Sequence, residues 1–375
     1  MKIVIAPDKF KGCLTAYAAA SALARGLARV WPEAGLQLCP IADGGEGTAR
    51  TLCDALQGEW ITCTVRDPLD RPVQAGYAWL PGEAMAVIEM SEASGLALVA
   101  PEERKPLLAS TYGTGQLMAD AIRRGARRLI VGIGGSATTD GGVGMARALG
   151  YRFLNARGEE IQRPAPENFL EIARIDTSQV GAFPEIIAAC DVQNPLLGPR
   201  GTATVFAPQK GASPEDVASL ERALAHLAAV LRHQFPDHTE TPGAGAAGGL
   251  GYGLLTFCGA AIRSGFELVA EILRLEEAIV GADLVVTGEG SLDGQTLEGK
   301  GPAGVAALAR RCGKPVIAFG GRVAREPQLD ALFDAVVPIA DRPMPLEEAL
   351  ASGETLLEQA AARAAALCRL GLRLS

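Results

Sequence analysis

Two short loops, each directly after an apolar run, carry acidic side chains that could bind a metal ion. The first is Asp43-Gly44-Gly45-Glu46, and the second runs from Thr287 to Asp293. Acids at the carboxyl ends of parallel strands lie at the mouth of the sheet, where they can hold Mg²⁺, often through water. Helix capping is the alternative for one such loop, but two at one sheet edge favour a function. The predicted metal ligands are Asp43, Glu46, Glu289 and Asp293.

Lysines beside glycines in similar loops indicate phosphate binding. Asp8-Lys9-Phe10-Lys11-Gly12 follows the first apolar run, although two solvated surface lysines are the competing interpretation. Gly294 to Lys300 fits seven positions of a Walker phosphate loop, but Gly301 stands where a hydroxyl would hold Mg²⁺. A Gly-Lys pair before a helix still favours an anion. The predicted nucleotide and phosphate contacts are Lys9, Lys11, Lys210, Thr287, Gly288, Gly299 and Lys300.

The densest glycine loop runs from Gly134 to Gly142 and follows another apolar strand. Its glycines expose successive N–H groups that could bind an anion, so Gly135 and Ser136 are predicted substrate contacts. Asp140 in this loop and Asp191, after the strand at 186–189, are two candidates for the base that accepts a substrate hydroxyl proton. Asp191 is the first choice, and helix capping is the alternative role for both residues.

Two glycine signatures raise the rival hypothesis of an NAD-dependent oxidoreductase. Residues 132–137 fit G-x-G-x-x-A, and residues 243–248 fit G-x-G-x-x-G. The first lacks the ribose-binding acid at the end of the next strand, and the second follows Pro242 and a polar loop. The sequence context of each signature therefore argues against a dinucleotide site.

Hydrophobic patterning predicts an α/β protein with a parallel sheet covered by helices. Short apolar strands alternate with helices at both ends of the chain, and the last helix is predicted as one Ala-rich segment from Leu346 to Leu370. Strands of antiparallel character occupy residues 60–90. We therefore expect one domain from residues 1–62 plus 279–375 and an inserted α/β domain at 63–278. The active site is expected in the cleft between them.

Composition excludes several classes of protein. A formal net charge of −8 with no basic stripe argues against nucleic acid, and no run is long and apolar enough to span a bilayer. The eight cysteines form no C-x-x-C pair, and no signal peptide precedes them, so reduced thiols in a cytoplasmic protein are expected. A non-catalytic sugar-acid sensor would need a DNA-binding or partner module, which the pattern lacks.

Taken together, these segments resemble the bacterial glycerate kinase family. The resemblance begins with Ala6-Pro7-Asp8-Lys9-Phe10-Lys11-Gly12, where the family often has Ser in place of Lys9, and the matching blocks follow in order over nearly the whole chain. They are residues 42–48, 111–115, 133–142, 190–196, 206–212, 242–249 and 287–293, with Gly299-Lys300.

The resemblance implies a Rossmann-like domain with an inserted domain and phosphoryl transfer from ATP, with Mg²⁺, to D-glycerate. The expected product is 2-phosphoglycerate, with 3-phosphoglycerate as the alternative. Phosphoryl transfer needs positioning and charge stabilisation, so Lys11 joins Asp191 and Asp140 as a catalytic candidate. Arg71 could form a bidentate pair with the glycerate carboxylate. A monomer or a homodimer is expected.

Overall fold

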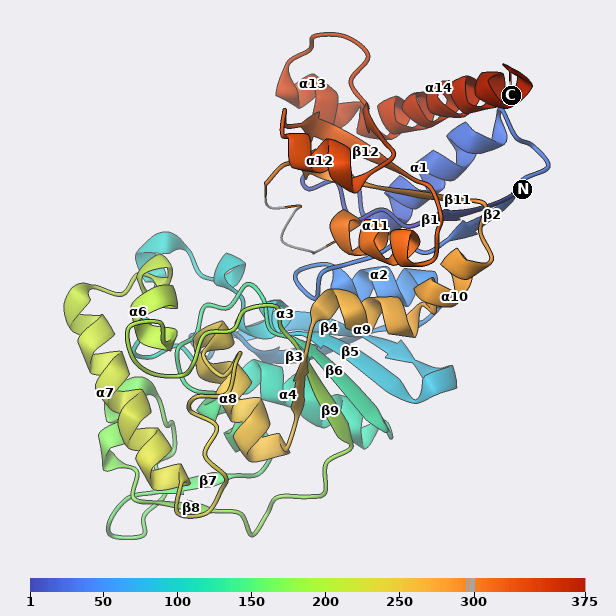
Figure 1. Ribbon diagram of the computed structural model, residues 1–375. Coiled ribbons are helices and arrows are strands. Elements are labelled where there is room, and N and C mark those ends of the chain that lie inside the picture. The colour runs from blue at the N-terminus through green and yellow to red at the C-terminus, as the bar shows by residue number, and fades with distance from the viewer. Residues whose placement is uncertain (295, 297–300, 375) are drawn as a thin grey trace. The chain divides into compact units, whose positions relative to one another are not determined.

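The computed structural model describes residues 1–294, 296 and 301–374, and the chain forms two compact units. Unit 1 comprises Met1–Asp43, Asp54–Leu56 and Phe266–Ser375, and unit 2 comprises Gly44–Cys53 and Gln57–Gly265. The chain thus passes from unit 1 to unit 2 at residues 43–44 and returns at residues 265–266, apart from the short segment Asp54–Leu56. The predicted domain boundaries follow residues 62 and 278. Figure 1 shows both units, with unit 1 built from the blue and the orange-to-red parts of the chain.

Unit 1 is built on a five-stranded sheet in which every neighbouring pair is parallel. Its strands are β1 (Lys2–Ile5), β2 (Gly35–Leu38), β11 (Leu284–Leu292), β12 (Val316–Val323) and β13 (Ala335–Pro338). The order β13-β12-β11-β1-β2 is that of a doubly wound sheet whose direction of winding reverses between β1 and β11. This confirms the predicted α/β class with a parallel sheet.

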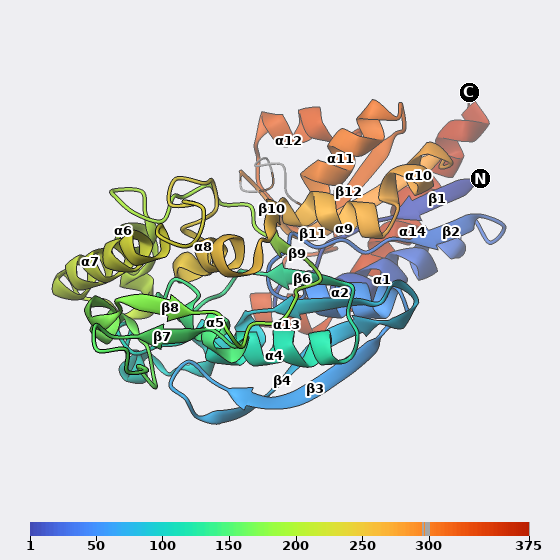
Figure 2. The same cartoon turned by 90° about the horizontal axis from the view of Figure 1, so that it is seen from below.

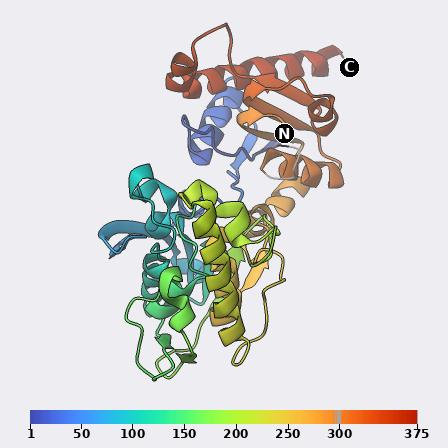
Figure 3. The same cartoon turned by 90° about the vertical axis from the view of Figure 1, so that its left-hand side faces the viewer.

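Helices cover both faces of this sheet because the strand residues alternate between two cores. Ile3 and Ile5 pack under α1 (Ala16–Ala28) and α14 (Gly353–Leu374), and Val4 and Ala6 face the opposite core. The second core includes α10 (Leu275–Val280), α11 (Pro302–Arg311) and α12 (Pro327–Leu332). Figure 3 shows the red C-terminal helix beside the blue N-terminal one. Alanines and Gly26 allow this close packing, since a side chain at Gly26 would meet Glu358 O.

The C-terminal segment differs from the single helix that was predicted. It divides into α13 (Leu346–Ala351) and α14, with the break at Ser352 and Gly353. A Cβ at Gly353 would collide with Cys13 Sγ, so only glycine lets the loop after β1 approach here. Tertiary packing therefore decides the break, although the local propensity of this Ala- and Leu-rich segment favours a continuous helix.

Unit 2 contains a six-stranded mixed sheet in the order β10-β9-β6-β5-β4-β3. The strands are β3 (Glu59–Arg66), β4 (Pro72–Leu80), β5 (Met85–Glu89), β6 (Arg128–Gly132), β9 (Glu185–Ala189) and β10 (Ala261–Arg263). Strands β3 to β5 pair antiparallel, as the sequence predicted, and β5, β6, β9 and β10 pair parallel. A separate hairpin joins β7 (Arg152–Leu154) to β8 (Arg174–Asp176).

The helices of unit 2 are α2 (Thr48–Ala55), α3 (Ser91–Ser94), α4 (Tyr112–Arg123), α5 (Val143–Ala148), α6 (Thr202–Phe206), α7 (Pro214–Leu231) and α8 (Ala246–Cys258). Side chains of α3, α4, α5, α7 and α8 belong to one large apolar core, whereas α6 contributes to a separate small cluster. Figure 2 shows α4 beside the sheet that β3 and β4 border. The sequence fixes the start of α7 locally, because Ser213 as N-cap and Asp216 at N3 form a reciprocal capping box with Pro214 at the first helical position. In the part of the chain that the structure describes, no helix could cross a membrane.

Candidate active site

The site in unit 1 lies where β1 and β11 end side by side. Asp8 follows β1, and Glu289 lies in the extension of β11 beyond its pairing with β1. The Asp8 N–H donates to Gly288 O at 2.8 Å, which joins the two strand ends. The crevice beyond this reversal point is where open parallel sheets bind their ligands. The topology thus concentrates the polar loops of both chain ends at one edge.

A cavity of about 780 Å³ opens at this edge, entirely within unit 1. That volume lies in the range of small-molecule sites. Five of the predicted site residues line it, together with Asp8. The charged residues that we use below are Asp8, Lys9, Lys11, Asp43, Glu289 and Asp293. The structure therefore brings together residues that the sequence separates by nearly three hundred positions.

Two carboxyl groups in this cavity have strongly raised pKa values. Burial raises the pKa of Asp8 to about 6, against a hydrogen bond from the Lys9 N–H to its Oδ1 at 2.6 Å. Burial likewise raises the pKa of Glu289 to about 7, and the negative charges of Asp8, Asp293 and Asp43 add to the effect. Thr296 Oγ1 donates to Glu289 Oε1 at 2.6 Å and partly offsets it. Perturbed carboxyl groups in a cavity are typical of functional sites.

The acids of this cavity fit a magnesium ion held jointly with phosphate. Among the residues that the structure describes, no three His, Cys, Asp or Glu side chains form a metal-binding group by themselves. Mg²⁺ commonly uses only one or two carboxylates and completes its shell with water and substrate phosphates. A nearby cation would also relieve the repulsion that keeps Glu289 and Asp8 prone to protonation. The chemistry of the donors therefore suits the metal.

Glu46, the fourth predicted metal ligand, lies in unit 2 and is exposed. Its loop is held by Glu89, a buried residue at the end of β5. Glu89 Oε2 accepts from the Gly47 N–H at 2.9 Å, and Oε1 accepts from the Ala49 N–H at 2.7 Å. Glu89 thus fixes the start of α2, and the sequence analysis missed it because its acceptor role depends on a contact 40 residues away.

The predicted phosphate contacts have different positions. Lys9 and Lys11 line the cavity, and Lys11 is exposed. Thr287 is fully buried and donates to Ala6 O at 2.7 Å, so its hydroxyl joins β11 to β1. Gly288 permits close strand pairing, because a Cβ there would meet Phe319 O. Gly299 and Lys300 lie outside the described residues.

In unit 2, Asp140 organises the glycine loop that follows β6. It is fully buried and accepts four hydrogen bonds from Thr111 N, Thr111 Oγ1, Gly142 N and Gly144 N, at 2.8, 2.9, 3.2 and 3.1 Å. Burial raises its pKa and these donors lower it. The carboxylate thereby satisfies N–H groups at the start of α5, although the N-cap position itself belongs to Gly142.

Lys210 belongs to the same loop structure. Its side chain is 1% exposed, and Nζ donates to Ser136 Oγ and to Thr138 O, each at 2.6 Å. Burial lowers the pKa of Lys210 to about 7, while the charge of Asp140 acts in the opposite direction. The lysine thus anchors the loop that contains Gly135 and Ser136, with its ammonium group withdrawn from solvent.

Asp191 has a more open environment than Asp140. It follows β9, the neighbour of β6, so it shares the carboxyl edge of this sheet with the glycine loop. Its side chain is partly exposed, and Oδ1 accepts from the Gly265 N–H at 3.1 Å. A base must reach a substrate proton, and this accessibility suits that role better than the enclosure of Asp140.

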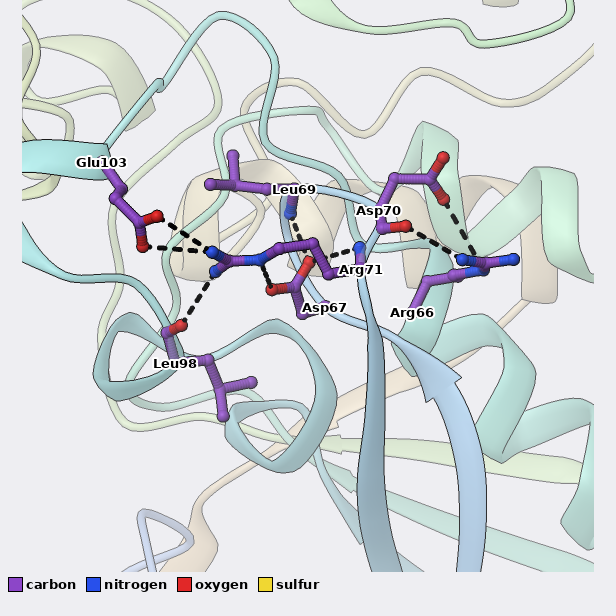
Figure 4. Close-up of polar contacts among 7 residues, drawn as sticks. All are labelled: Arg66, Asp67, Leu69, Asp70, Arg71, Leu98 and Glu103. Carbon is purple, nitrogen blue, oxygen red and sulfur yellow. Dashed lines mark hydrogen bonds and ion pairs between the residues drawn. The ribbon is translucent and has the colours of Figure 1, made fainter.

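Arg71 lies in a turn between β3 and β4 and is engaged by two acids, as Figure 4 shows. Its Nε donates to the buried Asp67 at 2.6 Å, and Nη1 contacts both carboxylate oxygens of Glu103 at 3.0 and 3.1 Å. Asp67 also accepts from the N–H groups of Leu69 and Arg71. The Arg71 and Glu103 side chains are 44% and 45% exposed, so this outer pair is open to exchange with another carboxylate.

The glycine motif at 243–248 has a packing role. Ala247, Gly248 and Gly249 have positive φ within α8, and a Cβ at Gly248 would collide with Thr138 O. The Gly141 N–H donates to Gly248 O at 3.0 Å. The segment at 243–248 thus packs against residues 138–141, which gives its glycines a structural role.

Sequence reasoning missed Asp8 and Thr296 as functional candidates. Asp8 carried the same signal as Asp43, an acid directly after an apolar strand. The loop was interpreted as a phosphate-binding loop because of its lysines, and Asp8 was not considered. Thr296 gave no local signal, because its contact with Glu289 depends on the turn that its N–H closes to Asp293 O. The prediction that the active site lies in a cleft between the domains stays a prediction.

Comparisons with known proteins point in one direction. Residues 3–369 match the model of the Glycerate kinase family. A glycerate kinase of Halalkalibacterium halodurans is 47% identical over 365 residues, which cover 96% of each chain. The glycerate 2-kinase of Escherichia coli is 40% identical and covers 100% of this chain and 99% of its own. The crystal structure of a candidate glycerate kinase 2 from Salmonella typhimurium LT2 has a TM-score of 0.92 at 41% identity, covering 100% of this chain and 99% of that one.

Proposed function

Because the chain belongs to the glycerate kinase family, we propose that it transfers the γ-phosphoryl group of ATP to the 2-hydroxyl of D-glycerate, giving 2-phosphoglycerate and ADP. The observation that carries the proposal is similarity over nearly the whole chain to curated glycerate kinases. The Escherichia coli relative, a glycerate 2-kinase, supports the 2-hydroxyl as acceptor. Transfer to the 3-hydroxyl is the alternative.

In the proposed mechanism, unit 1 binds the phosphates of ATP. Lys9 and Lys11 line its cavity and supply positive charge toward the β- and γ-phosphates, where negative charge develops. The exposed Lys11 acts as the catalytic lysine. Bound Mg²⁺ would neutralise phosphate charge, and the carboxyl groups of Glu289, Asp8, Asp43 and Asp293 would hold it. Its charge would favour the ionised forms of Asp8 and Glu289.

The acceptor chemistry is proposed for unit 2. Asp191 accepts the proton of the substrate hydroxyl as the phosphoryl group leaves ATP. N–H groups of the loop around Gly135, with Ser136, bind the glycerate carboxylate, and Lys210 keeps that loop in place. Arg71 is proposed to contact the same carboxylate by exchanging it for Glu103 while Asp67 holds the guanidinium.

All eight cysteines are free thiols, which supports a reducing, cytoplasmic location. The proposed partners are ATP and glycerate, and the chain is proposed to be a monomer or a homodimer.

The test is ADP release from MgATP in the presence of D-glycerate, with L-glycerate and no acceptor as controls. We expect ADP formation that depends on D-glycerate. NMR of the product should show phosphate on O2, whereas phosphate on O3 would establish the alternative. Absence of turnover with either enantiomer, in protein shown to be folded by circular dichroism, would refute the glycerate assignment.

A further inference from the structure

The cavity of unit 1 has an apolar wall that its phosphate and metal chemistry does not use. The wall consists of residues after β13 and of the α13–α14 region: Ile339, Ala340, Leu346, Ala349, Leu350 and Leu356. Leu346 is 74% exposed and Leu350 is 37% exposed. Exposed leucines gathered in a concave surface indicate a ligand with an apolar surface of its own.

The polar and apolar parts of the cavity are separated along the sheet edge. Following the strand order, apolar residues come after β13, whereas Glu289 belongs to β11 and Asp8 follows β1. Three strand spacings separate β13 from β1, which amounts to roughly 14 Å. A ligand that fills this cavity therefore has an apolar end and a charged end, separated by a spacer of comparable length.

The apolar wall is fixed to the phosphate-binding side. The Cys13 thiol donates to Leu350 O at 3.1 Å, which connects α13 to the loop that contains Lys9 and Lys11. The Gly353 backbone also packs closely against Cys13, where no side chain would fit. The break between α13 and α14 thus lets Leu346, Ala349 and Leu350 line the cavity while α14 stays packed in unit 1.

We propose that this wall binds the purine base of the nucleotide, with the triphosphate extending toward Lys9, Lys11 and the acids. The inference rests on the proposed function and adds to it the location of the base. Glycerate does not account for the wall, because each of its three carbons bears oxygen and it has no apolar face to bury. A purine ring has two, and stacking it on aliphatic side chains removes apolar surface from water.

The experiment compares two ligands that differ by the nucleoside. Isothermal titration of the wild-type protein and of Ala349→Trp with MgATP and with magnesium tripolyphosphate separates binding of the base from binding of the phosphates. We expect Ala349→Trp to fill the wall and raise the Kd for MgATP by about tenfold or more, a change of about 1.4 kcal/mol. Its Kd for magnesium tripolyphosphate should stay within about twofold of the wild-type value.

Leu350→Gln is a second, smaller change on the same wall, and Leu367→Gln is its matched control. Leu367 is 70% exposed on α14 and does not line the cavity. We expect Leu350→Gln to weaken the binding of MgATP but not of magnesium tripolyphosphate. Leu367→Gln should change the affinity for neither ligand. Circular dichroism establishes that each variant is folded.

The outcomes separate this inference from the proposed function. If the wild-type protein phosphorylates D-glycerate but both wall variants bind MgATP normally, the base lies elsewhere and only the inference is overturned. Equal weakening of MgATP and tripolyphosphate would also overturn it, since the wall would then act on the phosphates. A wild-type protein that neither binds MgATP nor turns over glycerate would refute the proposed function and the inference with it.

Discussion

The carboxyl groups of the unit 1 cavity and Asp140 of unit 2 follow strands in the same way but have opposite environments. Asp8 and Glu289 line a cavity, where burial, with the charges of neighbouring acids, raises their pKa values to about 6 and about 7. Asp140 has no exposed surface, and four donors satisfy its oxygens. Acids that follow strands thus have like-charged neighbours in the unit 1 cavity and hydrogen-bond donors around them in the unit 2 loop.

The comparison has an energetic consequence. The unit 1 acids destabilise the folded protein in their ionised state, because burial and like charge disfavour it. The unit 2 loop gains stability from the hydrogen bonds that its buried groups make. Binding of a cation or phosphate is therefore expected to change the stability of the first region strongly and that of the second only weakly.

Asp191→Asn tests whether the accessible carboxylate of unit 2 is a base, and we expect the largest effect here. The amide cannot accept the substrate proton, so kcat should fall by about 10²–10⁴-fold. Steady-state kinetics with circular dichroism measure this, and the exposed Asp54→Asn serves as control. A kcat within about threefold of wild type, which is what an exposed surface substitution would give, would show that Asp191 is not the catalytic base.

Glu289→Gln should separate activity from stability. Loss of a metal-directed carboxylate should lower activity by roughly 10–100-fold. The same change removes a carboxyl group whose ionisation costs stability, so the Tm should rise by a few degrees at pH 8.

The pH dependence gives the sign of that second effect. Between pH 4.5 and about 7 the folded protein binds more protons at Glu289 than the unfolded chain does, so the wild-type protein loses stability as pH rises through this window. The Tm advantage of Glu289→Gln should therefore shrink at pH 5, and the exposed Glu171→Gln should show none at either pH. A lower Tm for Glu289→Gln at pH 8 would contradict the repulsion that we describe.

Arg71→Lys tests the proposed carboxylate contact at the edge of unit 2. Lysine keeps the charge but loses the planar fork, so the KM for glycerate should rise by about tenfold while the KM for ATP is unchanged. Arg66→Lys is the matched control, since Arg66 donates to Asp70 O in the same turn (Figure 4). An unchanged KM for glycerate would confine Arg71 to holding Asp67 and Glu103.

Lys210→Met should have the smallest effect on catalysis and a measurable effect on stability. Two buried acceptors, Ser136 Oγ and Thr138 O, lose their donor, which should lower the free energy of unfolding by roughly 1–3 kcal/mol. From pH 7 to about 10 the unfolded chain binds more protons at this lysine, so the wild-type protein gains stability. Urea unfolding at pH 7 and 9.5 should show the gap to Lys210→Met widening, with the exposed Lys105→Met unaffected. An equal gap at both pH values would mean that Lys210 is not neutralised by burial.

Much of the fold could be predicted from the sequence. The strand at Ile3 to Ala6 and those near 284 and 316 were expected, because short apolar runs bounded by glycine and acids are typical of buried parallel strands. The extensions of β11 to Leu292 and β12 to Val323 were not, since Gly288 and Gly320 interrupt the pattern. Those glycines are explained by close strand pairing, which only the partner strand reveals.

The candidate site could be predicted in its residue types and in the sheet edge that its acidic loops share, but not in the cavity that these residues line. Lys9, Lys11, Asp43, Glu289 and Asp293 were chosen from local patterns, and the cavity brings them together. Lys210 was chosen for phosphate by the same reasoning, yet its ammonium group lies buried against Ser136. A lysine beside a glycine gives the same local signal in both settings, so burial alone distinguishes them.

By itself the sequence determined the family and the α/β class and gave a set of polar residues as candidates for phosphoryl transfer, because these depend on short motifs and on hydrophobic period. Only the tertiary structure decided which carboxyl groups are repelled in a cavity and which are enclosed by donors. It also decided that α13 and α14 separate to present an apolar wall. These features depend on contacts between segments far apart in the chain, and burial, hydrogen bonding and pKa are properties of those contacts.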